Sequence, residues 1–204
     1  MAFNPTPKQL TIVKVVVFLL ALLPITRIAL ATGEQTNPLE FLTHGTGDWA
    51  LYLLCTTLAV TPLRKLTGLN WLVRLRRMLG LFTFFYAFLH FTCFIWFDHF
   101  FDLHEIWKDV LKRPFITVGF AAFLLLVPLA ATSSNAMVRR LGGKRWQGLH
   151  RMIYLIAPLA VLHYWWMKAG KHNTGTPMLF AFIVAGLLLI RVFLNRSKVQ
   201  AARV

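Results

Sequence analysis

The stretch MLGLFTFFYAFLHFTCFIWF, residues 78–97, contains no lysine, arginine, aspartate or glutamate and carries a single histidine, His90. A helix rises 1.5 Å per residue, so a run of about 20 residues extends about 30 Å, the thickness of the hydrocarbon core of a bilayer. An ionisable side chain at that depth is costly and usually functional. The stretch therefore predicts a transmembrane helix that presents a histidine inside the membrane.

Five further apolar runs accompany this stretch, each near the roughly 17–25 residues that a spanning helix needs. They cover residues 12–31, 49–63, 115–131, 149–167 and 177–194. The chain of 204 residues is 57% hydrophobic and 14% charged, whereas a soluble domain carries about 25% charged residues. We therefore predict an all-α integral membrane bundle of six transmembrane helices and exclude a soluble fold. No loop is long enough for a second domain, so we expect residues 1–204 to form a single domain.

The 22 lysine and arginine residues outnumber the 7 aspartate and glutamate residues, which gives a formal net charge of +15. In a soluble protein such a balance would point to nucleic acid. Here most of the basic residues fall in segments on the same side as the N-terminus, and all the acidic residues fall on the other side. Because basic loops stay in the cytoplasm, this asymmetry predicts that both termini are cytoplasmic. Anionic lipid headgroups account for the positive charge without nucleic acid.

The longest predicted loop lies on the acidic side and contains DHFFDLHEIWKDVLK, residues 98–112. Its aromatic and aliphatic residues recur at helical spacing, which predicts an interfacial helix on the outer surface. Four histidines fall in predicted outer loops, where we expect exposure to solvent. They are His44, His99, His104 and His172.

Two other histidines fall at matched depth in different spans. His90 lies 12 residues into the run that begins at residue 78, and His163 lies 14 residues into the run that begins at residue 149. At 1.5 Å per residue, both lie roughly 18–21 Å from the cytoplasmic edge. Six-coordinate haem needs one imidazole on each face of its ring, so the pair is a candidate axial couple. The alternative is two histidines that hydrogen-bond to neighbouring helices.

His150 lies 13 residues before His163, which is roughly 19–20 Å lower in a continuous helix. In an ideal helix the two rings would face about 140° apart, and Pro158 lies between them. Arg76 and Arg77 occupy the level where a second haem would need a ligand, and arginine suits phosphates or haem propionates better than iron. The role of His150 thus stays open: it is either a redox-site residue or a hydrogen-bonded interface residue.

Several segments resemble a known family. They are KQLTIVKV (8–15), VTPL (60–63), RLRRMLGLFTFFYAFLH (74–90), LKRPFITVG (111–119) and TSSNAMVRRLGGKRWQGLHRMIYLIAPLAVLHY (132–164). They resemble the MsrQ family, also called YedZ, whose members are haem-binding membrane subunits of the bacterial periplasmic methionine sulfoxide reductase system. That family is similar to the ferric reductase-like transmembrane domains, and the resemblance extends over essentially the whole chain.

The resemblance implies that residues 1–204 are a single ferric reductase-like transmembrane cytochrome b domain, with His90, His150 and His163 as haem histidines and iron ligands. It implies haem b, in one or two copies, and FMN on the cytoplasmic side. It also implies a multi-pass protein of the bacterial inner membrane. Its electrons would come from the quinone pool or a cytosolic flavin reductase and pass to a periplasmic molybdopterin methionine sulfoxide reductase that repairs oxidised envelope proteins. The chain would then be the electron-transfer subunit and not the catalytic subunit.

The chain departs from the wider superfamily at one point, because Arg76 and Arg77 lie near the position of that superfamily's fourth haem histidine. This departure leaves the number of haems open between one and two. It also leaves open a flavin phosphate site formed by Arg76, Arg77 and His150.

Two other functions stay open at the level of sequence. One is a ferric or oxygen reductase-type membrane cytochrome, although the chain has no Gly-rich dinucleotide fingerprint. The other is a cofactor-free transporter or assembly factor, which would purify colourless. The predicted spans contain no acidic residue that could couple ion movement, which weakens the transporter hypothesis.

Overall fold

The computed structural model describes residues 4–170 and 173–201, with side chains up to Leu194, and this part of the chain contains helices and turns but no strand. Its long helices are α1 (Pro7–Thr32), α2 (Pro38–Thr67), α3 (Arg76–Cys93), α5 (Pro114–Ala131), α8 (Ile153–Ala169) and α9 (Gly175–Ala201). Shorter elements join them: the 3₁₀ helix η1 (Asn70–Arg74), the π-helix η2 (Phe94–Asp98), α4 (Leu103–Lys112), α6 (Asn135–Leu141) and α7 (Gly143–His150). The prediction of an all-α fold is confirmed.

Four helical segments are long and apolar enough to cross a membrane. They are Pro7–Thr32, Arg76–Asp98, Pro114–Ala131 and Gly175–Leu194. The other two predicted runs also form helices, but α8 has only 17 residues because a break at residues 151–152 separates it from α7. α2 has 30 residues and carries Glu40, His44 and Asp48 along its first turns. Length and composition thus support four of the six predicted spans.

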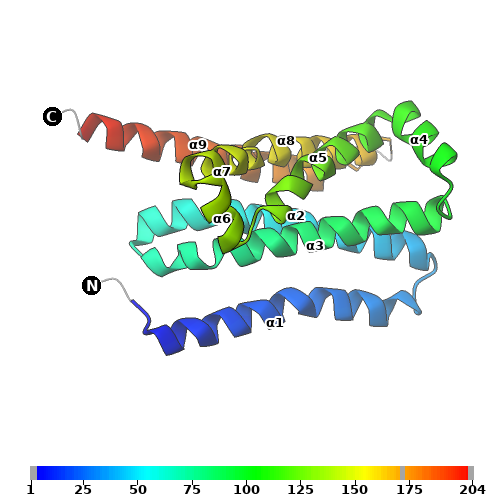
Figure 1. The fold of residues 1–204 in the computed structure, drawn as a ribbon. Coiled ribbons are helices and arrows are strands. Elements are labelled where there is room, and N and C mark those ends of the chain that lie inside the picture. The colour runs from blue at the N-terminus through cyan, green and yellow to red at the C-terminus, as the bar shows by residue number, and fades with distance from the viewer. Residues whose placement is uncertain (1–3, 171–172, 202–204) are drawn as a thin grey trace.

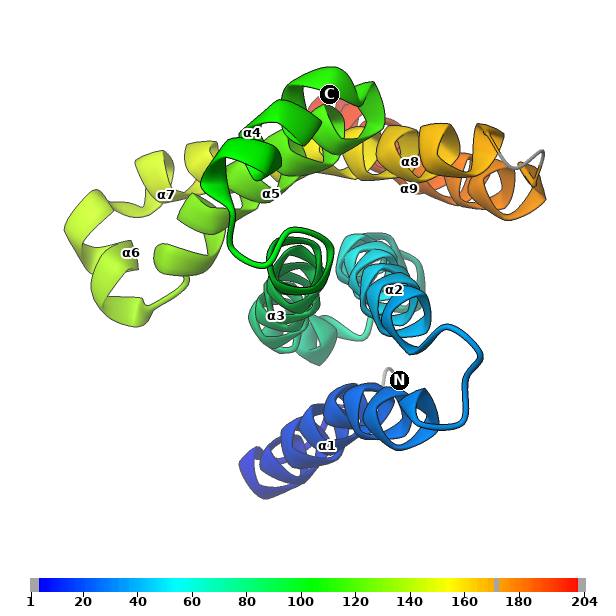
Figure 2. The ribbon, with the colours of Figure 1, turned by 90° about the vertical axis from the view of Figure 1, so that its right-hand side faces the viewer.

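The long helices run side by side, with the start of α1 and the end of α9 at one end of the bundle and α4 at the other (Figure 1). Figure 2 shows α2 and α3 at the centre, α1 on one side of them, and α5, α8 and α9 on the other. One apolar cluster joins α2 to α5, α8 and α9 around Leu58 and Ala157. A second joins α1, α2 and α3 around the fully buried Tyr86.

α1 presents a continuous apolar face to its surroundings. Ile12, Leu19 and Leu30 are 62%, 59% and 81% exposed, although α1 is almost entirely apolar. Soluble proteins rarely leave so large an apolar surface in water. The face instead suits lipid acyl chains, in agreement with the membrane-crossing length of α1.

α4 is the helix that the spacing in residues 98–112 predicts. Its buried face packs through Ile106 and Val110, whereas Leu103, Trp107 and Leu111 are exposed. These three residues are four positions apart and therefore lie on one face of the helix. α4 is amphipathic with an apolar side directed outward, the form that interfacial helices take.

α1 and α3 are joined by a side chain inserted into a helical hydrogen-bond ladder. The Tyr86 hydroxyl donates to the Ala21 carbonyl at 2.8 Å and accepts from the Ile25 N–H at 3.1 Å. The two backbone groups are those that a regular helix would pair with each other. Pro24, which lacks an N–H, lies within the same turn. The tyrosine therefore stabilises α1 where its own ladder is weakest.

A buried arginine plays a comparable part in α2. Pro62 lies inside α2 and cannot donate to the carbonyl of Leu58, four residues earlier. Arg191 of α9 donates from Nη2 to that carbonyl at 2.8 Å and from Nη1 to the Tyr154 hydroxyl at 2.6 Å. Arg191 is only 6% exposed. It thus joins α9 to α2 and α8 by satisfying a carbonyl that the proline has freed.

We expect Arg191→Met to destabilise the protein by about 1–3 kcal/mol, because it leaves the buried Leu58 carbonyl without its donor and removes the hydrogen bond to the Tyr154 hydroxyl. Thermal unfolding in detergent measures the loss. The matched control is Arg27→Met, since Arg27 is exposed on α1 and surface substitutions usually change stability by less than about 0.5 kcal/mol. Equal melting temperatures for the two variants would contradict the assignment.

Candidate functional site

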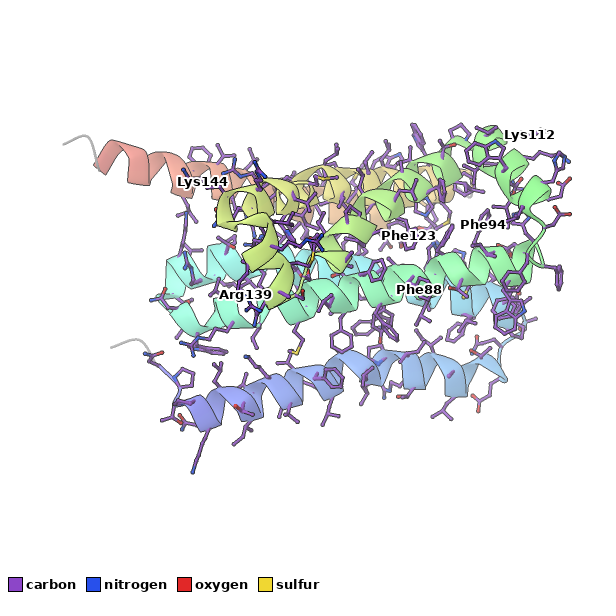
Figure 3. All side chains as sticks on the ribbon, viewed as in Figure 1. Phe88, Phe94, Lys112, Phe123, Arg139 and Lys144 are labelled. Atoms are coloured by element: carbon purple, nitrogen blue, oxygen red, sulfur yellow. The ribbon has the colours of Figure 1, made fainter. Side chains whose placement is uncertain are left out.

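A cavity of about 710 Å³, here called the outer cavity, lies between α2, α3, α5 and α8 in the half of the bundle nearer α4. Its walls are mostly aromatic and aliphatic, and Figure 3 labels two of the wall residues, Phe94 and Phe123. His90 of α3 and His163 of α8 both line it. A cavity of this size, apolar with few polar groups, is typical of a cofactor site.

The two histidine rings face each other across the outer cavity. Their centroids are 6.0 Å apart and their planes are inclined at 74°. Two imidazoles that bind one metal ion through Nε2, with metal–nitrogen bonds of about 2.0–2.1 Å, have centroids about 6 Å apart. The spacing of the rings therefore matches that of two axial ligands on one iron.

Hydrogen bonds to backbone carbonyls fix the orientation of both rings. His90 Nδ1 lies 2.9 Å from the Thr43 carbonyl oxygen of α2, and His163 Nδ1 lies 2.7 Å from the Phe115 carbonyl oxygen of α5. A carbonyl oxygen only accepts, so each Nδ1 carries the proton and donates it. Each Nε2 then keeps its lone pair, which is the form in which a histidine binds a metal. The donor set fits haem iron, and ligation itself stays a prediction.

The mouth of the outer cavity is polar. Asp109 of α4 lies close to two nitrogen-bearing side chains: its Oδ2 is 3.3 Å from His99 Nε2, and its Oδ1 is 3.2 Å from Arg113 Nε. All three residues line the cavity, as does Asp98. The side chain of His99 is only 12% exposed, so the expectation of a solvent-exposed loop histidine is wrong for His99. His104 is exposed as expected, His44 is partly buried at the cavity mouth, and His172 lies outside the described residues.

The chain takes an unusual path between His90 and α4. The π-helix η2 (Phe94–Asp98) extends α3, and Phe100 and Phe101 follow with φ of 47° and 65°. Left-handed backbone is costly for bulky residues and is concentrated at functional sites, as π-helices are. This path reverses the chain and brings His99 against Asp109.

An exposed ion pair lies just before Asp109 on α4. Lys108 Nζ lies 2.7 Å from Glu105 Oε1. The hydrogen bond from Lys108 lowers the pKa of the Glu105 carboxyl, and the same contact raises the pKa of the Lys108 amine. Both groups therefore stay ionised across the neutral pH range.

A second cavity of about 450 Å³, here called the inner cavity, lies toward α6 and α7. Arg76, Arg77, Arg151 and His150 line it, and among the described lining residues there is no carboxylate. Figure 3 shows that Arg139 and Lys144 extend the same basic end of the bundle, opposite Lys112. The inner cavity is therefore suited to an anionic ligand.

His150 is separate from the His90 and His163 pair. Its Nδ1 donates to the Trp146 carbonyl at 3.1 Å, and its ring stacks on that of Trp146 with centroids 3.9 Å apart. Its Nε2 lies 3.4 Å from the Ser133 hydroxyl, which already donates to the Leu129 carbonyl at 2.7 Å. Both ring nitrogens of His150 therefore lie near polar groups of the neighbouring segments, and the ring lines the inner cavity.

The position of His150 differs from the sequence expectation in one respect. α7 ends at His150 and α8 begins at Ile153, so the two histidines do not lie on one continuous helix. The angular offset of about 140° computed for an unbroken helix therefore does not apply. The break before α8, rather than the proline at position 158, sets the orientation of His150.

Comparison with known proteins identifies the family of this chain. The sequence model of the family described as "Ferric reductase like transmembrane component" matches residues 46–161. The haem-binding subunit MsrQ of the protein-methionine-sulfoxide reductase of Herminiimonas arsenicoxydans is 65% identical over 196 residues, which cover 95% of this chain and 90% of the relative. This chain belongs to the MsrQ family. MsrQ of Ralstonia nicotianae is 58% identical over 92% of this chain and 88% of its own length, and MsrQ of Bordetella pertussis is 50% identical over 92% of each.

The structure of this MsrQ family member brings the predicted site residues into two groups. His90 and His163 meet in the outer cavity, and Arg76, Arg77 and His150 meet in the inner cavity. The two cavities share Thr83 and Leu126 as wall residues. Each group joins residues that the spacing along the sequence places at one level of the bundle. The cofactor that each group binds stays a prediction.

Sequence reasoning missed the polar mouth of the outer cavity. Asp109 lies on the predicted interfacial helix and Arg113 directly follows that helix, four residues after Asp109, which is a recognisable helical ion-pair spacing. The contact of Asp109 with His99 has no such signal, because it depends on the backbone reversal at Phe100 and Phe101. The sequence also gives no sign that the carbonyls of Thr43 and Phe115 accept hydrogen bonds from the histidines, because every residue has a backbone carbonyl.

We expect His90→Ala and His163→Ala each to abolish the low-spin haem spectrum of the purified protein, because either change leaves one face of the iron without a ligand. Reduced-minus-oxidised absorption spectra with haem quantified per chain provide the measurement. His104→Ala, on the exposed side of α4, is the control and should keep the full spectrum. If both His90→Ala and His163→Ala keep the wild-type amount of low-spin haem, the axial assignment is contradicted.

Proposed function

We propose that this chain is a transmembrane b-type cytochrome that carries electrons from the cytoplasmic face to a periplasmic methionine sulfoxide reductase. The observation that carries the proposal is the pair of inward-facing imidazoles, 6.0 Å apart, with each Nδ1 held by a backbone carbonyl. Relatives named as haem-binding subunits of protein-methionine-sulfoxide reductase support the same function. The chain would be the electron-transfer subunit of the system, and the catalytic subunit would be its partner.

The proposed topology has six spans, with α2 and α8 crossing beside the four longer apolar segments, and both termini in the cytoplasm. The start of α1 and the end of α9 lie at the same end of the bundle, near α6 and α7 (Figure 1). That end carries basic residues such as Arg139 and Lys144, as cytoplasmic loops do. The acidic α4 end would then face the periplasm. The proposed location is the bacterial inner membrane.

The outer cavity is the proposed haem b site, with His90 and His163 as axial ligands. A haem held there supplies a one-electron iron couple whose potential the protein sets through its ligands and surroundings. Phe91, Phe120 and Phe123 form an apolar wall that keeps water from the site. At the mouth, Arg113 is placed to hold a propionate carboxylate.

The inner cavity is the proposed point of electron entry. Arg76, Arg77 and Arg151 suit the phosphate of FMN or the propionates of a second haem, and His150 lines the same cavity. FMN carries a phosphate and haem carries propionate carboxylates, so in either case the arginines would bind an anionic group. The native donor would be quinol or a cytosolic flavin reductase. The haem number would be one if the inner cavity binds FMN alone and two if His150 binds iron.

Aromatic side chains connect the two cavities. Phe84 lines the inner cavity and stacks on Phe123 of the outer cavity, with centroids 6.0 Å apart and planes inclined by 8°. Phe123 in turn lies 4.6 Å from Phe91, beside His90. This arrangement leaves a short, closely packed path between electron entry and the outer site. From there the α4 surface would be the place where the periplasmic molybdopterin subunit docks, for repair of envelope proteins under oxidative stress.

A second candidate is a ferric or oxygen reductase-type membrane cytochrome. It is favoured by the match to the ferric reductase-like family and by the opening of the outer cavity among polar residues at His99, Asp109 and Arg113. Such a protein would reduce a ferric chelate or oxygen directly at the outer mouth. It would need no periplasmic partner protein.

We expect liposomes that contain this chain, with reduced FMN inside and the periplasmic catalytic subunit plus a methionine-sulfoxide peptide outside, to reduce the sulfoxide. Each sulfoxide consumes two electrons, delivered one at a time. Substituting both Arg76→Gln and Arg77→Gln should slow haem reduction from inside by roughly tenfold, since the cationic cavity that attracts the anionic donor is weakened. His163→Ala should abolish transfer.

The same liposomes distinguish the two candidates. Reduction of a ferric chelate or of oxygen outside, at equal rates with and without the catalytic subunit, would favour the reductase function. No transfer to any acceptor by haem-loaded protein would contradict both.

A further inference from the structure

Each inward-facing histidine ring lies directly against a glycine of the neighbouring helix. A Cβ atom added to Gly47 of α2 would lie 3.0 Å from His90 Nδ1, and one added to Gly119 of α5 would lie 2.6 Å from His163 Nδ1. Ordinary contacts of a Cβ atom are 3.4–4 Å. A side chain at either glycine would therefore occupy the space that the imidazole now fills.

The two glycines hold equivalent places relative to the hydrogen-bonding carbonyls. Gly47 follows Thr43 by four residues on α2, and Gly119 follows Phe115 by four residues on α5. Residues four apart lie on one face of a helix, one turn above the other. Each ring thus rests on a glycine while its Nδ1 donates to the carbonyl one turn earlier. The same construction occurs twice, on two different helix pairs.

The other glycines of the long helices do not meet a histidine ring. A Cβ atom at Gly45 would lie 3.0 Å from Ile28 Cδ1, at the far end of a flexible side chain, whereas one at Gly80 would meet nothing nearer than 3.9 Å and one at Gly186 would meet nothing within 4 Å. Replacement of glycine by alanine also improves the helical propensity of an interior position. Helix stability alone therefore gives no reason for glycine at positions 47 and 119.

We propose that Gly47 and Gly119 are positioning residues for the two iron ligands, and that each forms a histidine seat with the carbonyl one turn before it. This inference rests on the proposed haem site. The seat lets the ring approach the helix until Nδ1–H reaches the carbonyl, and this directs Nε2 into the cavity. A hydrogen bond from Nδ1–H raises the basicity of the ligand, which stabilises the oxidised iron. The seats therefore set both the ring orientation and the reduction potential.

The test compares Gly47→Ala and Gly119→Ala with the control Gly186→Ala, each in the full chain loaded with haem. The readouts are the midpoint potential and the electron paramagnetic resonance spectrum of the ferric protein, which reports the mutual angle of the imidazole planes. We expect Gly119→Ala to raise the potential and alter the low-spin signal, and Gly47→Ala to do so less, since its added Cβ intrudes less. Gly186→Ala should match the wild type. If Gly119→Ala also matches it, the proposal is overturned.

A second comparison applies even if Gly119→Ala binds no haem or folds poorly. In the His163→Ala background there is no ring for the new methyl group to meet, so Gly119→Ala should cost no stability there. Thermal unfolding of the haem-free proteins measures this coupling. An equal loss of melting temperature in both backgrounds would show that Gly119 serves helix packing alone. Because this comparison needs no haem, it separates failure of the seat from failure of the proposed cytochrome function.

Discussion

Two hydrogen bonds inside the helix bundle, from His90 to the Thr43 carbonyl and from His163 to the Phe115 carbonyl, constrain the rest of the structure. A polar ring in an apolar interior is costly unless it is hydrogen-bonded. The partner carbonyls belong to α2 and α5, so α2 must pack along α3 and α5 along α8, as these pairs do. The outer cavity lies where the two helix pairs meet. The site and the packing of the bundle are therefore one arrangement.

The helices around the two histidines depend on hydrogen bonds between their backbone groups and side chains of neighbouring helices. Pro24 and Pro62 weaken the ladders of α1 and α2, and Tyr86 and Arg191 satisfy the affected backbone groups. In a membrane, water cannot take that role, and at Pro24 and Pro62 a side chain from another helix takes it instead. These contacts hold α1 and α9 on the central helices. Neither Tyr86 nor Arg191 lines the outer cavity, so these contacts fix the helices without filling it.

Much of this could be predicted from sequence, because hydrophobic runs and ionisable residues within them are strong local signals. The runs predicted the long helices, and residues 98–112 predicted α4. Counting along two runs placed His90 and His163 at one level, and the structure brings them 6.0 Å apart. The break between α7 and α8 was not predicted, because the apolar run 149–167 predicts one continuous helix although His150 and Arg151 lie near its start. The positions of His99 and of the accepting carbonyls depend on tertiary packing, for which a single sequence carries no pattern.

The central claim is that two histidines at membrane depth hold one haem between them. Its most direct test is the electron paramagnetic resonance spectrum of the purified ferric protein, with haem and chain quantified in the same sample. If both rings bind iron, planes inclined at 74° would leave the two iron orbitals that interact with the rings nearly equal in energy. We therefore expect a highly anisotropic low-spin signal that is dominated by one large g value. Removal of either histidine should abolish the haem and its signal. Protein that folds in the presence of haem but contains none, or a signal typical of parallel imidazole planes, would contradict the central claim.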